Sequence, residues 1–66
     1  MKVTINGTAK ELTGNSHVSD IVAQFCKASK HVITEINGHI VPSNDWNKTL
    51  VKEGDSIELV AFVGGG

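Results

Sequence analysis

The sequence predicts an α+β fold in which one main helix packs on one face of a mixed sheet of four to five strands. Apolar and polar residues alternate near the start, in the middle and at the end of the chain. One segment between them has a helical period, and two Asn-Gly pairs mark hairpin turns. A single helix across one face of a sheet is the simplest way to bury the apolar sides of both.

The chain begins with a predicted hairpin. Val3 and Ile5 alternate with polar neighbours, which is the period of a half-buried strand. An Asn-Gly pair follows at positions 6–7, and this pair readily adopts the positive φ angles of a two-residue hairpin turn. The returning strand is expected over residues 8–12, before a loop marked by Gly and Asn at positions 14–15.

A helix is predicted over residues 18–29. Its apolar stripe, bordered by Cys26, consists of Val18, Ile21, Val22 and Phe25. Ser16 or His17 is the candidate N-cap, and Asp20 suits the positive N-terminal end of the helix dipole. Lys27 and Lys30 suit the opposite end for the same reason.

The next predicted strand has Val32, Thr34 and Ile36 on one side, although an apolar residue is expected at the inward position of Thr34. It ends in the second Asn-Gly pair, and a brief return over residues 39–41 precedes Pro42. Proline cannot donate to a sheet ladder, so this segment is a strand end or a sheet edge. Residues 43–48 are polar except for Trp46, which is expected to cover the core above a loop or one helical turn.

The last predicted strand covers residues 56–63, after a turn at 52–55. The core parity is shared by Ile57, Leu59 and Ala61, and the opposite parity by Glu58, Val60 and Phe62. Val60 and Phe62 are therefore apolar where solvent is expected, which indicates a partner surface beside the chain end. The first and last strands are expected to pair as parallel neighbours at the sheet centre, which is the β-grasp (ubiquitin-like) arrangement.

Size and composition favour a carrier, an adaptor or a subunit over an enzyme. The 66 residues suffice for one domain, 1–63, followed by a flexible glycine tail, 64–66. A domain this short buries roughly 60% of its unfolded surface, so it rarely encloses a catalytic pocket. Six Lys and no Arg stand against seven acidic residues, and no basic patch is evident, which argues against nucleic-acid binding.

Further composition features indicate a soluble cytoplasmic protein. A single cysteine, Cys26, excludes an internal disulfide and fits a reducing compartment. The N-terminus turns polar too early for a signal peptide, and no apolar run approaches the ~20 residues needed to span a membrane. The three histidines, His17, His31 and His39, lie in separate segments without zinc-site spacing, so neither a metal site nor a catalytic residue is predicted.

The chain ends in three glycines, and this end is the candidate functional feature. Glycine has no Cβ, so Gly64, Gly65 and Gly66 form a thin thread that can enter a narrow cleft. The carboxylate of Gly66 is then the candidate reactive group. The alternative is a frayed chain end, since termini are commonly disordered.

Several segments together resemble one family. They are Val3-Thr4-Ile5-Asn6-Gly7, Val18 to Phe25, Ile36-Asn37-Gly38-His39-Ile40-Val41-Pro42, Trp46, Gly54-Asp55-Ser56-Ile57-Glu58 and Phe62-Val63-Gly64-Gly65-Gly66. Over nearly its whole length the chain resembles the ThiS family, the ubiquitin-like sulfur carriers of thiamin thiazole biosynthesis. Ubiquitin-like modifiers and the small subunit of molybdopterin synthase share the glycine tail alone. The Ile-Val-Pro segment with Trp46 four residues past Pro42 favours ThiS, as does the short length.

The resemblance implies a carrier cycle at Gly66. An E1-like adenylyltransferase of the ThiF type would use MgATP to convert the carboxylate to an acyl-adenylate, and sulfur from a donor such as a cysteine desulfurase would replace the adenylate. A thiazole synthase of the ThiG type would accept sulfur from the resulting thiocarboxylate. Val60, Phe62 and Val63 would dock beside the enzyme's tunnel, which Gly64 and Gly65 would enter. The chain itself would bind no cofactor, metal, nucleic acid or membrane.

Three other functions remain open from the residues. The chain could carry sulfur for molybdopterin, or it could be a ubiquitin-like modifier that forms isopeptide bonds through Gly66. It could also be a plain interaction domain whose tail is inert.

Overall fold

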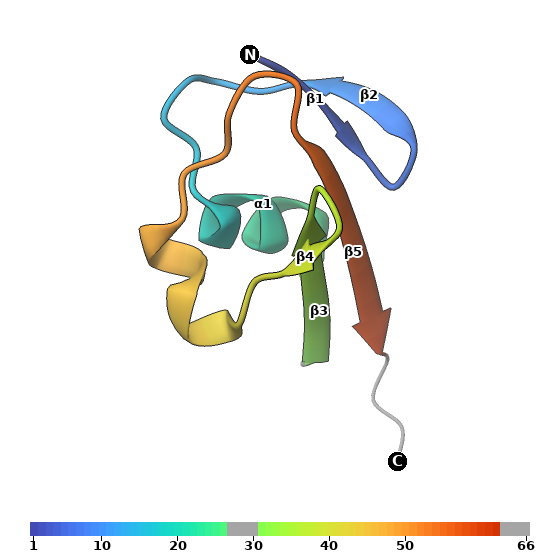
Figure 1. Ribbon diagram of the computed structural model, residues 1–66, viewed down its shortest axis with the longest axis vertical. Helices are drawn as coiled ribbons and strands as arrows, with labels where there is room; N and C mark the ends of the chain where they lie inside the picture. Colours follow the sequence, from blue (N-terminus) through green and yellow to red (C-terminus); the bar gives the residue numbers. More distant parts are fainter. Residues whose placement is uncertain (27–30, 63–66) are drawn as a thin grey trace.

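The computed structural model describes residues 1–26 and 31–62 (Figure 1). In these residues the order is β1 (Lys2–Ile5), β2 (Thr8–Glu11), α1 (Val18–Phe25), β3 (His31–Ile36), β4 (His39–Ile40), the 3₁₀ helix η1 (Ser43–Lys48) and β5 (Ser56–Phe62). Each predicted element is present, and residues 43–48 form a helical turn rather than a loop. The described helices include none that is long and apolar enough to cross a membrane.

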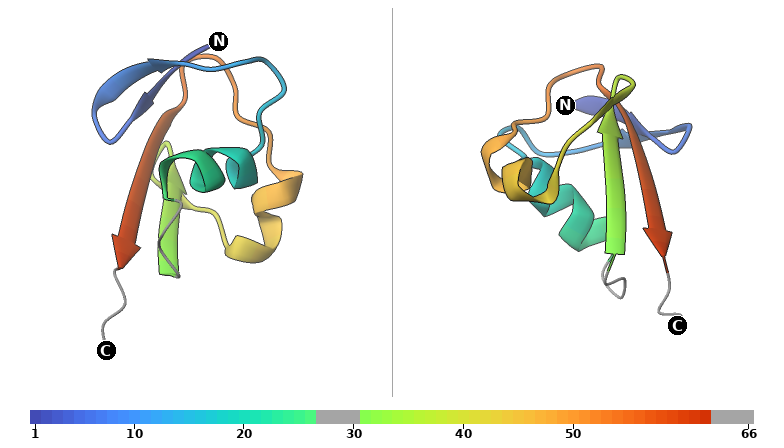
Figure 2. Two further views of the ribbon diagram at one scale, coloured as in Figure 1. Left: turned by 180° about the vertical axis from the view of Figure 1, so that it is seen from behind. Right: turned by 60° about the horizontal axis from the view of Figure 1, so that its bottom comes forward.

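The described strands form one five-stranded sheet in the order β2-β1-β5-β3-β4. β5 lies at its centre, parallel to β1 and antiparallel to β3. Both α1 and η1 lie on the same side of this sheet (Figures 1 and 2). The predicted β-grasp fold, with parallel first and last strands, is therefore confirmed.

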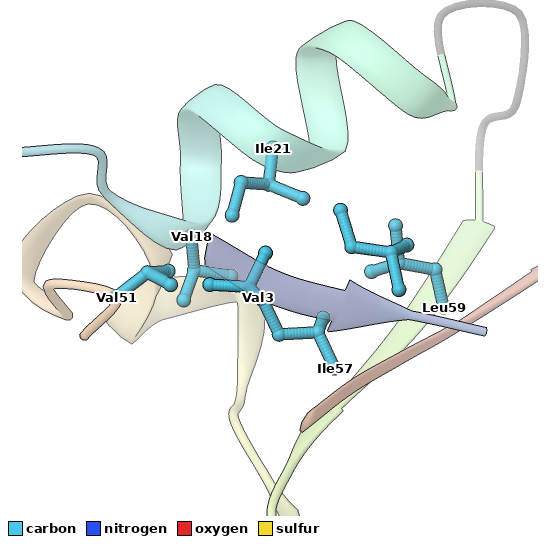
Figure 3. Packing of buried hydrophobic residues seen from close by; sticks show 7 residues of the cluster. Val3, Val18, Ile21, Val51, Ile57 and Leu59 are labelled. Carbon is cyan, nitrogen blue, oxygen red and sulfur yellow. The ribbon is translucent and has the colours of Figure 1, made fainter. Parts of the chain in front are cut away.

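The core lies between α1 and the sheet. Its buried members are Val3, Ile5, Val18, Ile21, Val51, Ile57 and Leu59. Figure 3 shows Val18 and Ile21 of the helix directed toward the strand residues. Trp46 packs against this cluster, as predicted, and its indole Nε1–H donates a hydrogen bond to the carbonyl of Val41 at 2.8 Å.

Both Asn-Gly pairs form the hairpin turns that the sequence predicts. Asn6 and Gly7 have φ angles of 50° and 83°, and Asn37 and Gly38 have 52° and 87°. Positive φ at both central residues is the signature of a type I′ turn, whose twist matches that of the strands it joins. The two turns therefore close the β1–β2 and β3–β4 hairpins without strain.

The asparagine side chains of these turns also bind β5. The Asn6 side chain accepts a hydrogen bond from the Leu59 N–H at 2.8 Å and donates one to the Leu59 carbonyl at 3.2 Å. On the other side, the Asn37 side-chain oxygen accepts from the Ser56 N–H at 3.0 Å. The Asn37 backbone N–H donates to the Ser56 carbonyl at 2.8 Å. β5 is thus fixed to both hairpins by more than its strand ladders.

The start of α1 is capped by His17, one of the two predicted candidates. The Asp20 carboxylate accepts a hydrogen bond from the His17 backbone N–H at 2.9 Å, which stabilises the first turn. Ser16 is buried instead, and its hydroxyl donates to the Thr13 carbonyl at 2.8 Å. The helix is described to Phe25, so the predicted extension over 27–29, with Lys27 and Lys30, lies outside the described residues.

Two residues with the inward parity, Ala61 and Thr34, do not have the environment of an ordinary core residue. Ala61 has the core parity but is exposed, which corrects the prediction that it packs in the core. An eight-residue helix is about 12 Å long, and it leaves this end of β5 uncovered. Thr34 is on the inward face as the alternation predicts and is 0% exposed, yet its hydroxyl has no hydrogen-bond partner among residues 1–26 and 31–62.

The chain start is tied to β2 by an ion pair. The Met1 ammonium lies 2.8 Å from the Glu11 carboxylate, and its backbone partner is the Leu12 carbonyl at 3.0 Å. The hydrogen bond to Glu11 raises the pKa of the ammonium, and the same bond lowers the pKa of the Glu11 carboxyl. The pair is at the surface, so it orders the terminus rather than holding the fold.

We expect Asn6→Gly to destabilise the fold by about 1 to 3 kcal/mol, because it removes two hydrogen bonds to Leu59 while glycine still permits the positive φ. Asn15→Gly is the matched control, since Asn15 also has a positive φ, of 64°, but no side-chain hydrogen bond in the described residues. Urea unfolding of both variants measures the difference. Equal stability of the two would show that the Asn6 side chain contributes nothing.

Thr34→Val should stabilise the protein by about 1 to 3 kcal/mol, because a methyl group of similar size replaces a buried hydroxyl that has no partner in the described part of the chain. Thr34→Ser keeps the hydroxyl and loses the methyl, so it should be less stable than the parent. Thermal unfolding of the three proteins gives the ranking. A valine variant that unfolds below the parent would mean that the hydroxyl does have a stabilising partner.

Candidate functional site

The face of the sheet opposite α1 has an exposed apolar patch. Its members are Ile33 (42% exposed), Ile40 (65%), Val60 (48%) and Phe62 (50%), and we call them the outer patch. Ile33 of β3 lies directly across from Val60 of β5. The prediction that Val60 and Phe62 are exposed on the outer parity is confirmed, whereas their role in binding a partner stays a prediction.

Sequence reasoning did not include Ile33 and Ile40 in this patch. Alternation had put Ile33 on the outer parity of its strand, but parity alone does not say which strand lies beside it. The antiparallel register of β3 and β5 puts Ile33 next to Val60, and the β3–β4 register puts Ile40 next to Glu35. The patch therefore spans three strands: β3 and β4, which form one hairpin, and β5, which is distant from them in the sequence.

The outer patch reaches the last described residue of the chain. Phe62 ends β5, directly across from His31 at the start of β3. The other predicted site residues, Val63, Gly64, Gly65 and Gly66, lie outside the described residues, as does the predicted boundary between domain and tail. One residue, Val63, separates Phe62 from the glycine segment 64–66, so the patch lies close to this segment in the sequence.

Two glutamates are direct cross-strand neighbours beside the patch. Glu35 of β3 and Glu58 of β5 are direct partners in the antiparallel register, one row of side chains from Ile33 and Val60. Side chains at such positions have Cβ atoms about 4.5–5.5 Å apart, and like charges there are destabilising. Within residues 1–26 and 31–62 the ion pairs are Met1–Glu11 and His17–Asp20, so neither glutamate has a compensating cation there.

The described part of the chain contains no enclosed pocket, and no three His, Cys, Asp or Glu side chains in it lie close enough to hold a metal ion. Its histidines are dispersed: His17 caps α1, His31 starts β3 and His39 follows the second hairpin turn. Cys26 is half-buried and packs against the core. Among the described residues, the feature that could contact a partner is therefore the outer patch.

Comparisons with known proteins agree with this picture. The model of the ThiS family matches residues 3–66. A thiazole synthase of Paramagnetospirillum magneticum is 35% identical over 66 residues, which cover all of this chain and 20% of that protein, so the chain spans about a fifth of its length. The sulfur carrier protein ThiS of Escherichia coli is 27% identical, and the match covers the full length of both chains.

A solved structure has the same fold. The crystal structure of a thiamine biosynthesis protein (ThiS) from Geobacter metallireducens matches with a TM-score of 0.83 and 29% sequence identity, and the match covers 100% of both chains. The two chains therefore share the fold over their matched lengths.

Proposed function

Because the chain belongs to the ThiS family, we propose that it is a sulfur carrier of thiamin biosynthesis whose reactive group is the carboxylate of Gly66. The observation that supports this most is that the family match runs to residue 66 and so includes the glycine end. The outer patch, which extends along β5 to Phe62, supports it further, since an enzyme that receives the tail can rest on an apolar surface next to it.

The proposed chemistry begins with activation of the carboxylate. An oxygen of Gly66 attacks the α-phosphorus of MgATP on an E1-like adenylyltransferase of the ThiF type, and pyrophosphate leaves. The terminal sulfur of a persulfide, formed by a cysteine desulfurase or a comparable donor, then attacks the acyl carbon, and AMP leaves. A thiol cleaves the resulting acyl disulfide, which yields the thiocarboxylate and a new disulfide. Each enzyme provides the catalytic groups, and the carrier provides the tether.

The acceptor that we propose is a thiazole synthase of the ThiG type. Support comes from the Paramagnetospirillum magneticum thiazole synthase, because one segment of that protein is similar to this whole chain. The carrier's part in each reaction is recognition by Val60, Phe62 and Val63 and passage of Gly64 and Gly65 into the enzyme. A thin thread suits a narrow tunnel because glycine adds no side chain. We expect this cycle in the cytoplasm, where a free thiol such as that of Cys26 stays reduced.

The mass of the intact protein tests this function directly. After incubation with MgATP, a ThiF-type enzyme and a sulfur donor, we expect one oxygen to be replaced by sulfur, and only in the C-terminal peptide that contains Gly66. Omitting MgATP is the control and should leave the mass unchanged. Conjugates to lysine side chains that resist a reducing agent would indicate a protein modifier instead. Sulfur transfer to molybdopterin but not to a thiazole would contradict the proposed function in thiamin biosynthesis.

We expect Gly65→Val to reduce the rate of thiocarboxylate formation about 100-fold and to leave thermal unfolding unchanged. A side chain in the thread displaces the terminal carboxylate, and a misplacement of about 1 Å can cost about 100-fold in rate. Gly14→Ala is the matched control, because a Cβ at Gly14 would meet no atom within 4 Å and its φ is ordinary. If Gly65→Val reacts as fast as the parent, the tail does not enter a narrow site.

A further inference from the structure

We propose that the facing carboxylates of Glu35 and Glu58, in the row beside Ile33 and Val60, receive a Lys or Arg side chain of thiazole synthase while the outer patch packs against an apolar surface of the same enzyme. This inference rests on the proposed function and adds to it the position and the charge of the contact.

The register of β3 and β5 gives the face a definite layout. The Glu35–Glu58 row is followed by the Ile33–Val60 row and then by the His31–Phe62 row, where the described chain ends. Side chains on one face of a strand recur every two residues, so neighbouring rows are about 7 Å apart. The acidic row thus lies about 14 Å from the Phe62 end, and Ile40 lies beside Glu35 at its far edge.

The acidic row has an unfavourable arrangement in the free protein. Glu35 is half-buried and Glu58 is exposed, and each has the other as its direct cross-strand neighbour on β3 and β5. The ion pairs of residues 1–26 and 31–62 lie elsewhere, at the chain start and at the start of α1. One guanidinium or ammonium group placed over the row would remove the repulsion and contact both carboxylates. An Arg suits this best, since its planar fork binds carboxylates in a bidentate manner.

The apolar neighbours explain why such a contact is strong enough to select a partner. A charge pair in open solvent adds little affinity, whereas one enclosed by apolar side chains is shielded from water and salt. Ile33, Ile40 and Val60 surround the acidic row on two sides and would exclude water when covered. The face therefore has the usual composition of an interface, with apolar anchors for burial and charged groups that fix the orientation.

Thiazole synthase is the occupant that the comparisons favour. In the Paramagnetospirillum magneticum protein, a segment similar to this whole chain belongs to the synthase polypeptide, so covalent attachment keeps it close to the rest of that protein. Without such an attachment, the contact surface itself has to supply the affinity. A second copy of this chain is a poor occupant, because two such faces packed together would bring four carboxylates into one site.

The test compares binding of the parent, Glu35→Gln, Glu58→Gln and the double variant to a purified thiazole synthase from the same organism, at low and at high salt. We expect the double variant to bind at least about tenfold more weakly at both salt concentrations, because a charge pair enclosed by apolar side chains is shielded from salt. Its thermal unfolding should occur at the same or a higher temperature, because the repulsion between β3 and β5 is gone. A merely structural role would instead lower the unfolding temperature and leave affinity unchanged.

Asp45→Asn is the matched control, because it removes the same charge from an exposed residue of η1 on the helix side of the sheet. It should bind like the parent. Equal binding of the double variant and the parent would overturn the inference, and so would variants that impair only the adenylyltransferase reaction. The proposed function is judged separately: a parent that forms the thiocarboxylate but binds no thiazole synthase contradicts the acceptor, whatever the glutamate variants do.

Discussion

Two asparagine side chains hold the central strand of this protein between its neighbours. Asn6 binds both the N–H and the carbonyl of Leu59, as one more residue of β1 would, and Asn37 binds the backbone of Ser56 from the other side. β5 contributes Ile57 and Leu59 to the core and Val60 and Phe62 to the outer patch. Both the packing of α1 and the direction of the chain end therefore depend on where these side chains fix one strand.

This central strand has opposite surroundings on its two faces. Toward α1 it is buried with Val3, Val18 and Ile21. This burial is important for stability, because so small a domain buries little apolar surface in total. Toward solvent it leaves apolar groups uncovered and two carboxylates side by side, which lowers the stability of the isolated chain. A face that weakens the free protein is the expected compromise if a complementary surface of a partner covers it, as proposed above.

Local patterns sufficed to predict the elements, because each depends on neighbouring residues alone. The Asn-Gly pairs determine their turns through backbone geometry, and alternation assigns Ile57 and Leu59 to one face and Val60 to the other. The contacts between distant segments could not be predicted in this way. Parity does not reveal that Ile33 lies across from Val60, or that Glu35 lies across from Glu58, since both depend on a register that the whole fold sets. Nor does the pattern show how far α1 covers β5, which is why the prediction that Ala61 packs in the core was wrong.

The Asn-Gly turns also bear on the chemical lifetime of the protein. An asparagine followed by glycine is prone to lose its side-chain amide, because the small neighbour lets the next backbone nitrogen reach the side-chain carbonyl. At Asn6 the loss would replace the donor to the Leu59 carbonyl with a carboxylate oxygen, and at Asn37 it would put a second negative charge against Asp55, now 3.0 Å from the amide. The same two residues that fix the central strand are thus the ones at which this loss would change its contacts.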